Sequence, residues 1–163
     1  MQALQTGATD VGIVMEGAEG ANAAGLKLFD YRDDVLCVVV PRKHPVRAKR
    51  LAFAALLDYD FVGLESNTVI SQLMLAQAMR EDKPLRLRVQ VKSFDVVAKL
   101  VQAGLGIGVL PDAAARAFAG PLGLRLIGLT DAWATRRMYV AVRQDETLAA
   151  PARLLVEHLT RVA

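Results

Sequence analysis

The sequence predicts an α/β fold, because short apolar segments typical of strands alternate with longer segments of helical periodicity. This alternation favours a mostly parallel sheet with helices in the connections. The predicted strands lie at residues 10–14, 35–40, 61–64, 85–91, 107–110, 124–129 and 138–142. One predicted helix ends at Gly7, and the others lie at residues 51–57, 69–80, 93–103, 112–119 and 151–162.

Two of the predicted strands are apolar throughout, so we expect both of their faces to be buried. Val35 to Val40 is the first, and Pro41 ends it in a turn. Phe61 to Leu64 is the second. Leu85 to Val91 instead alternates apolar with polar residues, which predicts a strand with one face in solvent.

Two predicted helices have an apolar stripe at helical spacing. The first begins after Thr68, and its buried side is expected to hold Val69, Ile70, Leu73 and Met74. The second is opened by Pro151 near the end of the chain, and its stripe is expected to hold Leu154, Leu155, Leu159 and Val162. Met15 to Gly25 is rich in Gly, Ala and Asn, so a loop is predicted there.

The segment from Ser93 to Pro111 is predicted to form a helix, a glycine turn and a buried strand. Ser93 lies at the N-cap position, and Asp95 lies in the first turn, where a negative charge is favoured. Gly104 is expected to end the helix in a left-handed conformation before the strand Ile107 to Leu110. A dinucleotide-binding motif needs a strand before its glycines and a helix after them, so the reversed order argues against that function.

Composition bounds the class of protein. The 163 residues, 53% hydrophobic and 23% charged, suffice for a sizeable core in one domain or two small lobes. The single cysteine, Cys37, lies in an apolar run, so we expect it to be buried, and no internal disulfide is possible. No segment approaches the roughly 18 to 20 apolar residues of a membrane span, and no signal peptide is recognised. A cytoplasmic protein without a membrane partner is predicted.

The densest basic segment runs from Arg42 to Arg50. The net charge of +3 is otherwise scattered, and by itself it does not indicate nucleic-acid binding. The basic segment has no aromatic residue on which a base could stack. A solvated connecting loop is favoured over a phosphate-binding patch, although both interpretations remain open.

Candidate ligand-binding residues lie where predicted strands give way to helices. Ser66, Asn67 and Thr68 precede the helix at 69–80, whose positive end and free N–H groups can hold a carboxylate or another anion. Ordinary N-capping explains the same residues equally well. Ser93 and Phe94 occupy the next such junction, and Phe94 could equally belong to the core.

The end of the first predicted strand offers a further candidate. Val14, Met15 and Glu16 lie there, and Met15 is included among the ligand-binding candidates although packing explains it better.

The residues give no positive indication of catalysis or of a bound cofactor. His44 and His158 are far apart and have no Cys or carboxylate at metal-ligand spacing. The sequence has no nucleophile elbow and no serine or cysteine close to a histidine. We therefore predict neither an enzyme, a metal site nor a cofactor.

Four segments in the same order resemble the effector-binding domain of LysR-type transcriptional regulators. LQTGATDVGIV at residues 4–14 resembles the family's L-x-x-G-x-x-D-L-x-I-x segment, and VVVPRKHP at 38–45 resembles its V-V-P-x-x-H-P turn. SFDVVAKLVQAGLGIGVLP at 93–111 is similar to its L-V-x-A-G-L-G-I-x-x-L-P signature. The segment from 137 to 153 is similar to the closing strand and L-S-P-A-A-R helix start, with Ala150 replacing serine.

The resemblance implies a type II periplasmic-binding-protein-like fold of two α/β subdomains with interchanged strands. Subdomain I would comprise about residues 1–59 and 138–163, and subdomain II about residues 60–137. A small effector would lie in the cleft between them. The family's winged helix-turn-helix, the first strand and most of the first helix are expected to be missing from this chain.

The implied function is sensing of a small anionic or carboxylate effector and relay of its binding, through the geometry of a homodimer or higher oligomer, to the DNA-binding domain. DNA would be a partner only through that missing domain. A transport solute-binding protein, or less favoured an enzyme on the same two-lobed fold, is the alternative. The sequence names neither the effector nor the operator.

Overall fold

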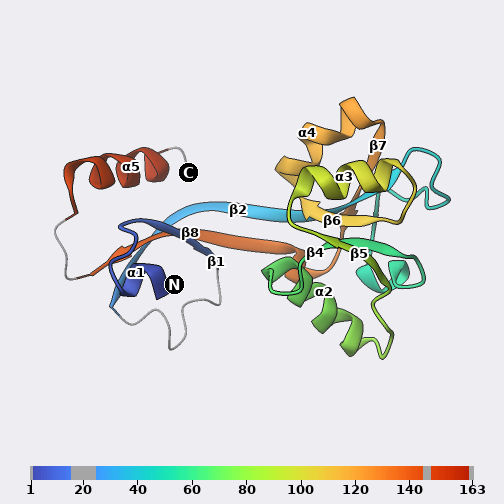
Figure 1. Cartoon of the computed structure of the whole chain (residues 1–163), viewed down its shortest axis with the longest axis horizontal. Coiled ribbons are helices and arrows are strands. Elements are labelled where there is room, and N and C mark those ends of the chain that lie inside the picture. Colours follow the sequence, from blue (N-terminus) through green and yellow to red (C-terminus); the bar gives the residue numbers. More distant parts are fainter. Residues whose placement is uncertain (1, 16–24, 145–147, 162–163) are drawn as a thin grey trace. The chain divides into compact units, whose positions relative to one another are not determined.

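The computed structural model describes residues 2–15, 25–144 and 148–161. Most of the loop predicted from Met15 to Gly25 therefore lies outside the described residues, as do Glu16 and Val162. The described chain is a mixed α/β structure, as predicted (Figure 1).

The strands are β1 (Gly12–Met15), β2 (Leu26–Pro41), β3 (Arg50–Leu51), β4 (Phe61–Leu64), β5 (Leu87–Val91), β6 (Gly108–Pro111), β7 (Leu124–Leu129) and β8 (Thr135–Arg143). The α-helices are α1 (Gln2–Gln5), α2 (Val69–Arg80), α3 (Phe94–Gln102), α4 (Asp112–Leu122) and α5 (Ala150–Arg161). Two short 3₁₀ helices lie at Phe53–Leu56 and Ala132–Ala134.

The contacts divide the chain into two compact units. Unit 1 comprises Met1–Asp34 and Arg136–Ala163, and unit 2 comprises Val35–Thr135. The chain thus passes between the units twice, along β2 and at the start of β8. The second half of β2 belongs to unit 2 because it pairs there with β6 and β7. The subdomain boundaries expected at about 59/60 and 137/138 stay a prediction.

Unit 1 is built on the antiparallel pair β1 and β8, with Gly12 opposite Ala141 and Met15 opposite Met138. Leu4 of α1 packs in a small buried cluster with strand residues, and Val156 of α5 packs in another with Val140 and Val142. The predicted stripe of α5 was wrong at Leu154 and Leu155, which are 63% and 47% exposed. Val156, one position further along the helix, is buried against the strands, and Leu159 of the predicted stripe packs half-buried against the same cluster.

The core of unit 2 surrounds the apolar half of β2. Residues 36–40 are at most 2% exposed, as predicted for a strand buried on both faces. β2 lies between β6 and β7 and is antiparallel to both, so the mostly parallel sheet that the alternation predicted was wrong here. β2 reaches unit 2 as the continuation of a strand that begins in unit 1, so the rule that makes helix-connected strands parallel does not apply to it. β6 and β7, which α4 connects, both oppose β2 and therefore share one direction.

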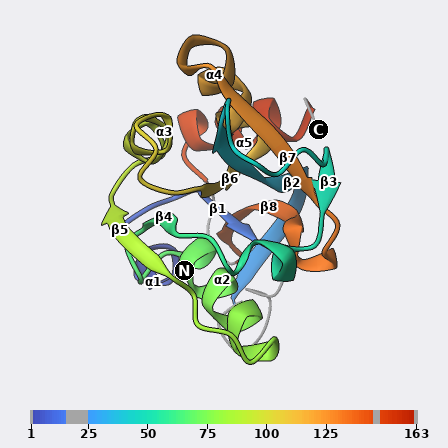
Figure 2. The same ribbon diagram turned by 90° about the vertical axis from the view of Figure 1, so that its right-hand side faces the viewer.

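β4 and β5 form a separate parallel pair connected by α2. β4 is fully buried, whereas β5 alternates half-buried with exposed residues, as predicted. Ile107 extends the parallel arrangement through a bridge to Phe61. Figures 1 and 2 agree in placing α2 on one side of these strands and α3 and α4 on the other.

Several element boundaries differ from those predicted. β2 begins at Leu26, nine residues before the predicted Val35, because its first half alternates apolar and charged residues. The helix predicted at 51–57 is a single 3₁₀ turn. Val69, expected on the buried side of α2, is 44% exposed, and the buried residues of that helix are Ile70, Ser71, Met74 and Ala78.

The glycine turn after α3 is formed as predicted. Gly104 has a φ of 80°, and the N–H of Leu105 donates to the carbonyl of Leu100 at 3.1 Å, which closes the helix end. Gly106 serves a different purpose, since a Cβ there would lie 2.5 Å from the carbonyl oxygen of Asp60. The first glycine is needed for backbone conformation and the second for close approach.

These two glycines should respond differently to alanine. Gly104→Ala has open space around its Cβ and is expected to cost about 1 to 2 kcal/mol, from the left-handed conformation alone. Gly106→Ala collides with backbone and should cost about 2 to 3 kcal/mol or more. Gly120→Ala, in α4 with open space around it, should instead stabilise by up to about 1 kcal/mol. Urea unfolding of the three variants would show this order, and equal losses at positions 104 and 106 would contradict it.

Candidate functional site

The start of α2 follows directly from the carboxyl end of β4. Thr68 is the N-cap residue, and its hydroxyl accepts the N–H of Ser71 at 3.4 Å. The same hydroxyl donates to the carbonyl of Glu65 at 2.9 Å. Thr68 therefore has the capping role that the sequence allowed, and its hydroxyl is fully engaged within the chain.

Ser71 fixes the helix start to the strand and was not among the predicted site residues. It is 5% exposed, and its hydroxyl donates to the carbonyl of Leu64 at 2.8 Å. The side-chain amide of Gln90, on β5, also donates to that carbonyl, at 3.4 Å. The spacing of Thr68 and Ser71, three residues apart at a helix start, is the sequence signal that could have identified this pair.

Ser66 and Asn67 remain exposed in front of α2. The first turn of this helix has no acidic residue, so no side chain there neutralises its positive end. Among the described residues, the backbone N–H groups of Val69 and Ile70 have no hydrogen-bond partner. Unpaired N–H groups at an open positive helix end are the usual components of an anion-binding site.

The start of α3 has the opposite charge character. Ser93 occupies the N-cap position as predicted, but its hydroxyl does not cap the backbone and donates to the carboxylate of Asp95 at 2.6 Å. This hydrogen bond, followed by that from Lys99, holds the pKa of Asp95 below its usual value. A carboxylate therefore already occupies the region where α3 would attract an anion.

The parallel pairing of β4 and β5 brings these two helix starts to the same end of the small sheet. Leu64 is opposite Val91, and the N–H of Glu65 donates to the carbonyl of Val91 at 3.1 Å. Lys92, which the sequence analysis did not single out, follows β5 and lies 3.8 Å from the carboxylate of Glu65. The junctions thus combine a cation, a carboxylate and exposed polar groups.

Phe94 and Met15 have different surroundings from the polar candidates. Phe94 is half-buried and packs against the main core of unit 2. Met15 is half-buried at the end of β1 in unit 1, opposite Met138. Met15 is the one candidate in unit 1, and the remaining five belong to unit 2: Ser66, Asn67, Thr68, Ser93 and Phe94. Whether any of the six candidates contacts a ligand stays a prediction.

The buried thiol and the histidine have surroundings that are not those of reactive groups. Cys37 is 2% exposed, and burial raises its pKa to about 12. His44 packs on Tyr59 with ring centroids 4.7 Å apart, and its pKa is lowered by burial and then by Arg125 and Arg47. Over residues 2–15, 25–144 and 148–161, no three His, Cys, Asp or Glu side chains are grouped to hold a metal ion.

Helix starts that follow parallel strands and present polar groups at one end of a sheet are where α/β domains bind small molecules. The chain belongs to the LysR substrate binding domain family, which matches residues 1–163. The predicted type II periplasmic-binding-protein-like fold and the predicted class of ligand-sensing regulatory domain are thereby confirmed. In the described part of the chain no helix has the length and apolar character needed to span a bilayer.

Similar proteins are transcriptional regulators and their regulatory domains. The chain is 24% identical over 153 residues to an uncharacterized HTH-type transcriptional regulator, YwbI of Bacillus subtilis, covering 93% of this chain and 50% of that protein. The regulatory domain of Synechocystis CcmR in complex with 2-PG has a TM-score of 0.83 and 22% identity, covering 99% of this chain and 76% of that one. The effector-binding domain of QuiR in complex with shikimate has a TM-score of 0.80 and 15% identity, with 99% and 75% coverage. The chain spans half or less of the length of these curated relatives.

The hydrogen bond at the α3 start predicts a shifted titration. Ser93→Ala should raise the pKa of Asp95 toward its ordinary value, since the principal group that lowers it is removed. Lys99→Met, which removes both a hydrogen bond and a nearby positive charge, should raise that pKa as well. Carboxyl-detected NMR titration measures both values, and an unchanged pKa in the Ser93 variant would contradict the assignment. With the native low pKa, the stabilisation from Asp95 is present above its unfolded-state pKa and is lost as pH falls through the folded value.

Proposed function

We propose that this chain senses a small anionic effector, of carboxylate type, whose charged group binds at the start of α2. The observation that carries the proposal is the open helix end: unpaired N–H groups of Val69 and Ile70 with no acidic residue in the first turn. Ser66 and Asn67 are exposed beside these groups and supply further donors. Thr68 contributes mainly by holding the helix start in place.

The ligands of two structural neighbours support this choice of chemistry. Shikimate, bound by QuiR, carries a carboxylate, and CcmR is in complex with 2-PG. The α3 start is expected to contribute the edge of Phe94 and polar contacts from Ser93, because Asp95 disfavours a second anion there. Met15, in unit 1, stays a predicted further contact of the effector.

The proposed role of this binding is regulation of transcription and not catalysis, in keeping with the names of the curated relatives. An effector can shift a regulator only by the difference between its affinities for the two conformational states. A homodimer or higher oligomer in the cytoplasm would transmit that shift to a DNA-binding domain. Neither a metal nor a cofactor has a role in this proposal.

A thermal-shift experiment tests the anion site. Shikimate and benzoate at about 100 times their dissociation constants should stabilise the chain by about 2.7 kcal/mol, which corresponds to roughly 5 to 10 °C in Tm. The uncharged methyl ester of shikimate is the matched control and should have little effect. Equal shifts with the acid and with its ester would contradict an anion site.

A substitution at the helix start separates binding from stability. Asn67→Asp places a carboxylate at the positive end of α2, so it should stabilise the free chain slightly, by about 0.3 to 1 kcal/mol, while removing the Tm shift caused by carboxylates. Thr68→Ala should lower the basal Tm through loss of the cap, at a cost of about 1 kcal/mol. Substitution of Ser66, Asn67 and Thr68 together by alanine should remove the shift. If carboxylates still shift the Tm of both the triple variant and Asn67→Asp, the start of α2 is not the binding site.

A further inference from the structure

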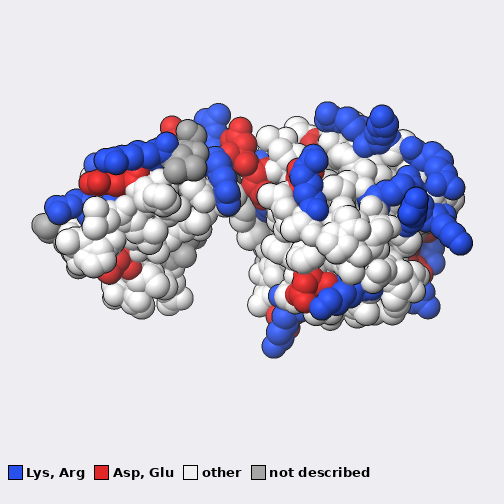
Figure 3. All heavy atoms as spheres, turned by 90° about the horizontal axis from the view of Figure 1, so that it is seen from above, with Lys and Arg blue, Asp and Glu red and all other residues white. Residues whose placement is uncertain are grey.

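The segment Arg42–Arg50, here named the basic segment, connects β2 to β3 in unit 2. It contains five Lys or Arg residues, and the sequence has no Asp or Glu from Val35 through Leu57. All five cationic residues are exposed. Figure 3 shows Lys and Arg side chains gathered over the part of unit 2 in which Figure 1 places this connection.

The cations of the basic segment lack the acidic partners that other surface cations have. Within the described residues, no ion pair involves Arg42, Lys43, Arg47 or Lys49. Their charge is therefore available to a partner.

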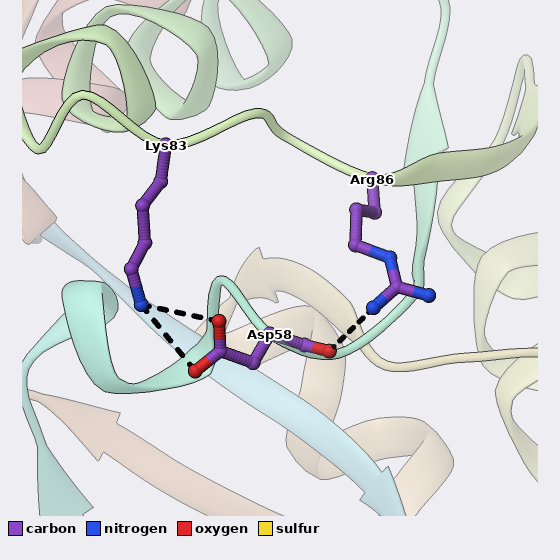
Figure 4. A network of polar contacts seen from close by, with 3 residues as sticks. All are labelled: Asp58, Lys83 and Arg86. Atoms are coloured by element: carbon purple, nitrogen blue, oxygen red, sulfur yellow. Dashed lines mark hydrogen bonds and ion pairs between the residues drawn. The ribbon is translucent and has the colours of Figure 1, made fainter.

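The exposed row of basic residues along β5 provides the contrast. Arg86 lies 3.0 Å and Arg88 3.7 Å from the carboxylate of Asp60, and Lys92 lies near Glu65. Figure 4 shows the neighbouring network, in which Lys83 contacts the carboxylate of Asp58 and Arg86 donates to the carbonyl of Asp58. The charges of this row are thus largely balanced within the chain.

The backbone of the basic segment is held in one conformation by Arg125 of β7. Its Nε donates to the carbonyl of Arg42 at 3.1 Å, and its Nη2 donates to the carbonyls of His44 and Val46 at 2.9 and 2.6 Å. The N–H of His44 closes a turn onto the carbonyl of Pro41 at 2.9 Å. The cations are therefore displayed from a fixed backbone, which lowers the entropy cost of binding a partner.

The surroundings of the segment are positive and include a hollow. Arg125 and Arg47 both contribute to lowering the pKa of His44, after burial. Arg42 and Lys43 line an open hollow of about 270 Å³ together with Gln102 and the apolar side chains of Leu122 and Leu124. No acidic residue lines it, so an anionic group that entered would meet two cations and an amide.

We propose that the basic segment is a contact surface for the phosphate backbone of duplex nucleic acid. Unpaired Lys and Arg on a fixed loop supply the sequence-independent attraction typical of phosphate contacts. The segment has no aromatic side chain to stack on a base, so it positions nucleic acid without reading sequence or capturing single strands. This surface is separate from the α2 start, and it does not depend on the function proposed above.

The salt dependence of binding tests the proposal. Fluorescence anisotropy of a labelled duplex of mixed sequence, titrated with the 163-residue chain, should show weak binding at about 50 mM salt that is lost toward 200 mM. Arg42→Ala/Lys43→Ala/Arg47→Ala should flatten the slope of log K against log salt by about 2 to 3, because each lost phosphate contact removes about 0.9.

A matched triple variant controls for net charge. Arg86→Ala/Arg88→Ala/Lys92→Ala removes the same charge from β5 and the two residues that flank it, and it should leave the slope nearly unchanged. Circular dichroism of both triples checks that they fold. Equal losses in the two triples, absence of duplex binding by the native chain at about 50 mM salt, or NMR shifts with inorganic phosphate but none with duplex would each overturn the proposal.

Discussion

The pairing of β2 on both of its edges is the constraint on which unit 2 depends. Residues 37–39 pair with β6 on one side and β7 on the other, and the side chains of residues 36–40 are buried on both faces. Burial of each such aliphatic side chain stabilises the fold by about 1.5 to 3 kcal/mol. The backbone N–H and C=O groups of the strand are hydrogen-bonded to the neighbouring strands. Because β6 and β7 take their direction from β2, α4, which connects them, is fixed as well. The turn after Pro41 lies at the end of this strand, and Arg125 holds it by donating hydrogen bonds to the carbonyls of Arg42 and His44.

The starts of α2 and α3 have similar local architecture, but they differ in whether the positive helix end is already occupied by a carboxylate. At α3 a carboxylate occupies the positive helix end and takes up the hydroxyl of Ser93. At α2 the hydroxyl groups of Thr68 and Ser71 are used to tie the helix to β4, and the remaining N–H groups are open. Strand pairing sets the position of both starts, whereas one acidic residue decides which of them can accept an anion.

Local patterns predicted some elements to the residue and failed where long-range pairing decides the outcome. β4, α2 and β7 have the predicted bounds, because apolar runs with clear caps or turns set their ends. The direction of β2 could not be predicted, since it depends on pairing with β6 and β7, which lie far away along the chain. Its early start was hidden by Asp30, Arg32 and Asp33, whose charges resemble a loop. At the site, Thr68 was identifiable as a cap, whereas the engagement of Ser93 by Asp95 depends on side-chain conformations that spacing does not fix.

Cys37, in the buried half of β2, determines how the chain can be labelled at a thiol. A thiol that stays protonated and inaccessible is a poor nucleophile, so alkylating reagents should leave the folded chain unmodified. A second cysteine introduced on the surface would then be the single reactive thiol, suited to one dye or spin label per molecule. Modification of Cys37 itself would report the opening of unit 2, because the reagent can reach the thiol only when the residues that bury it move away.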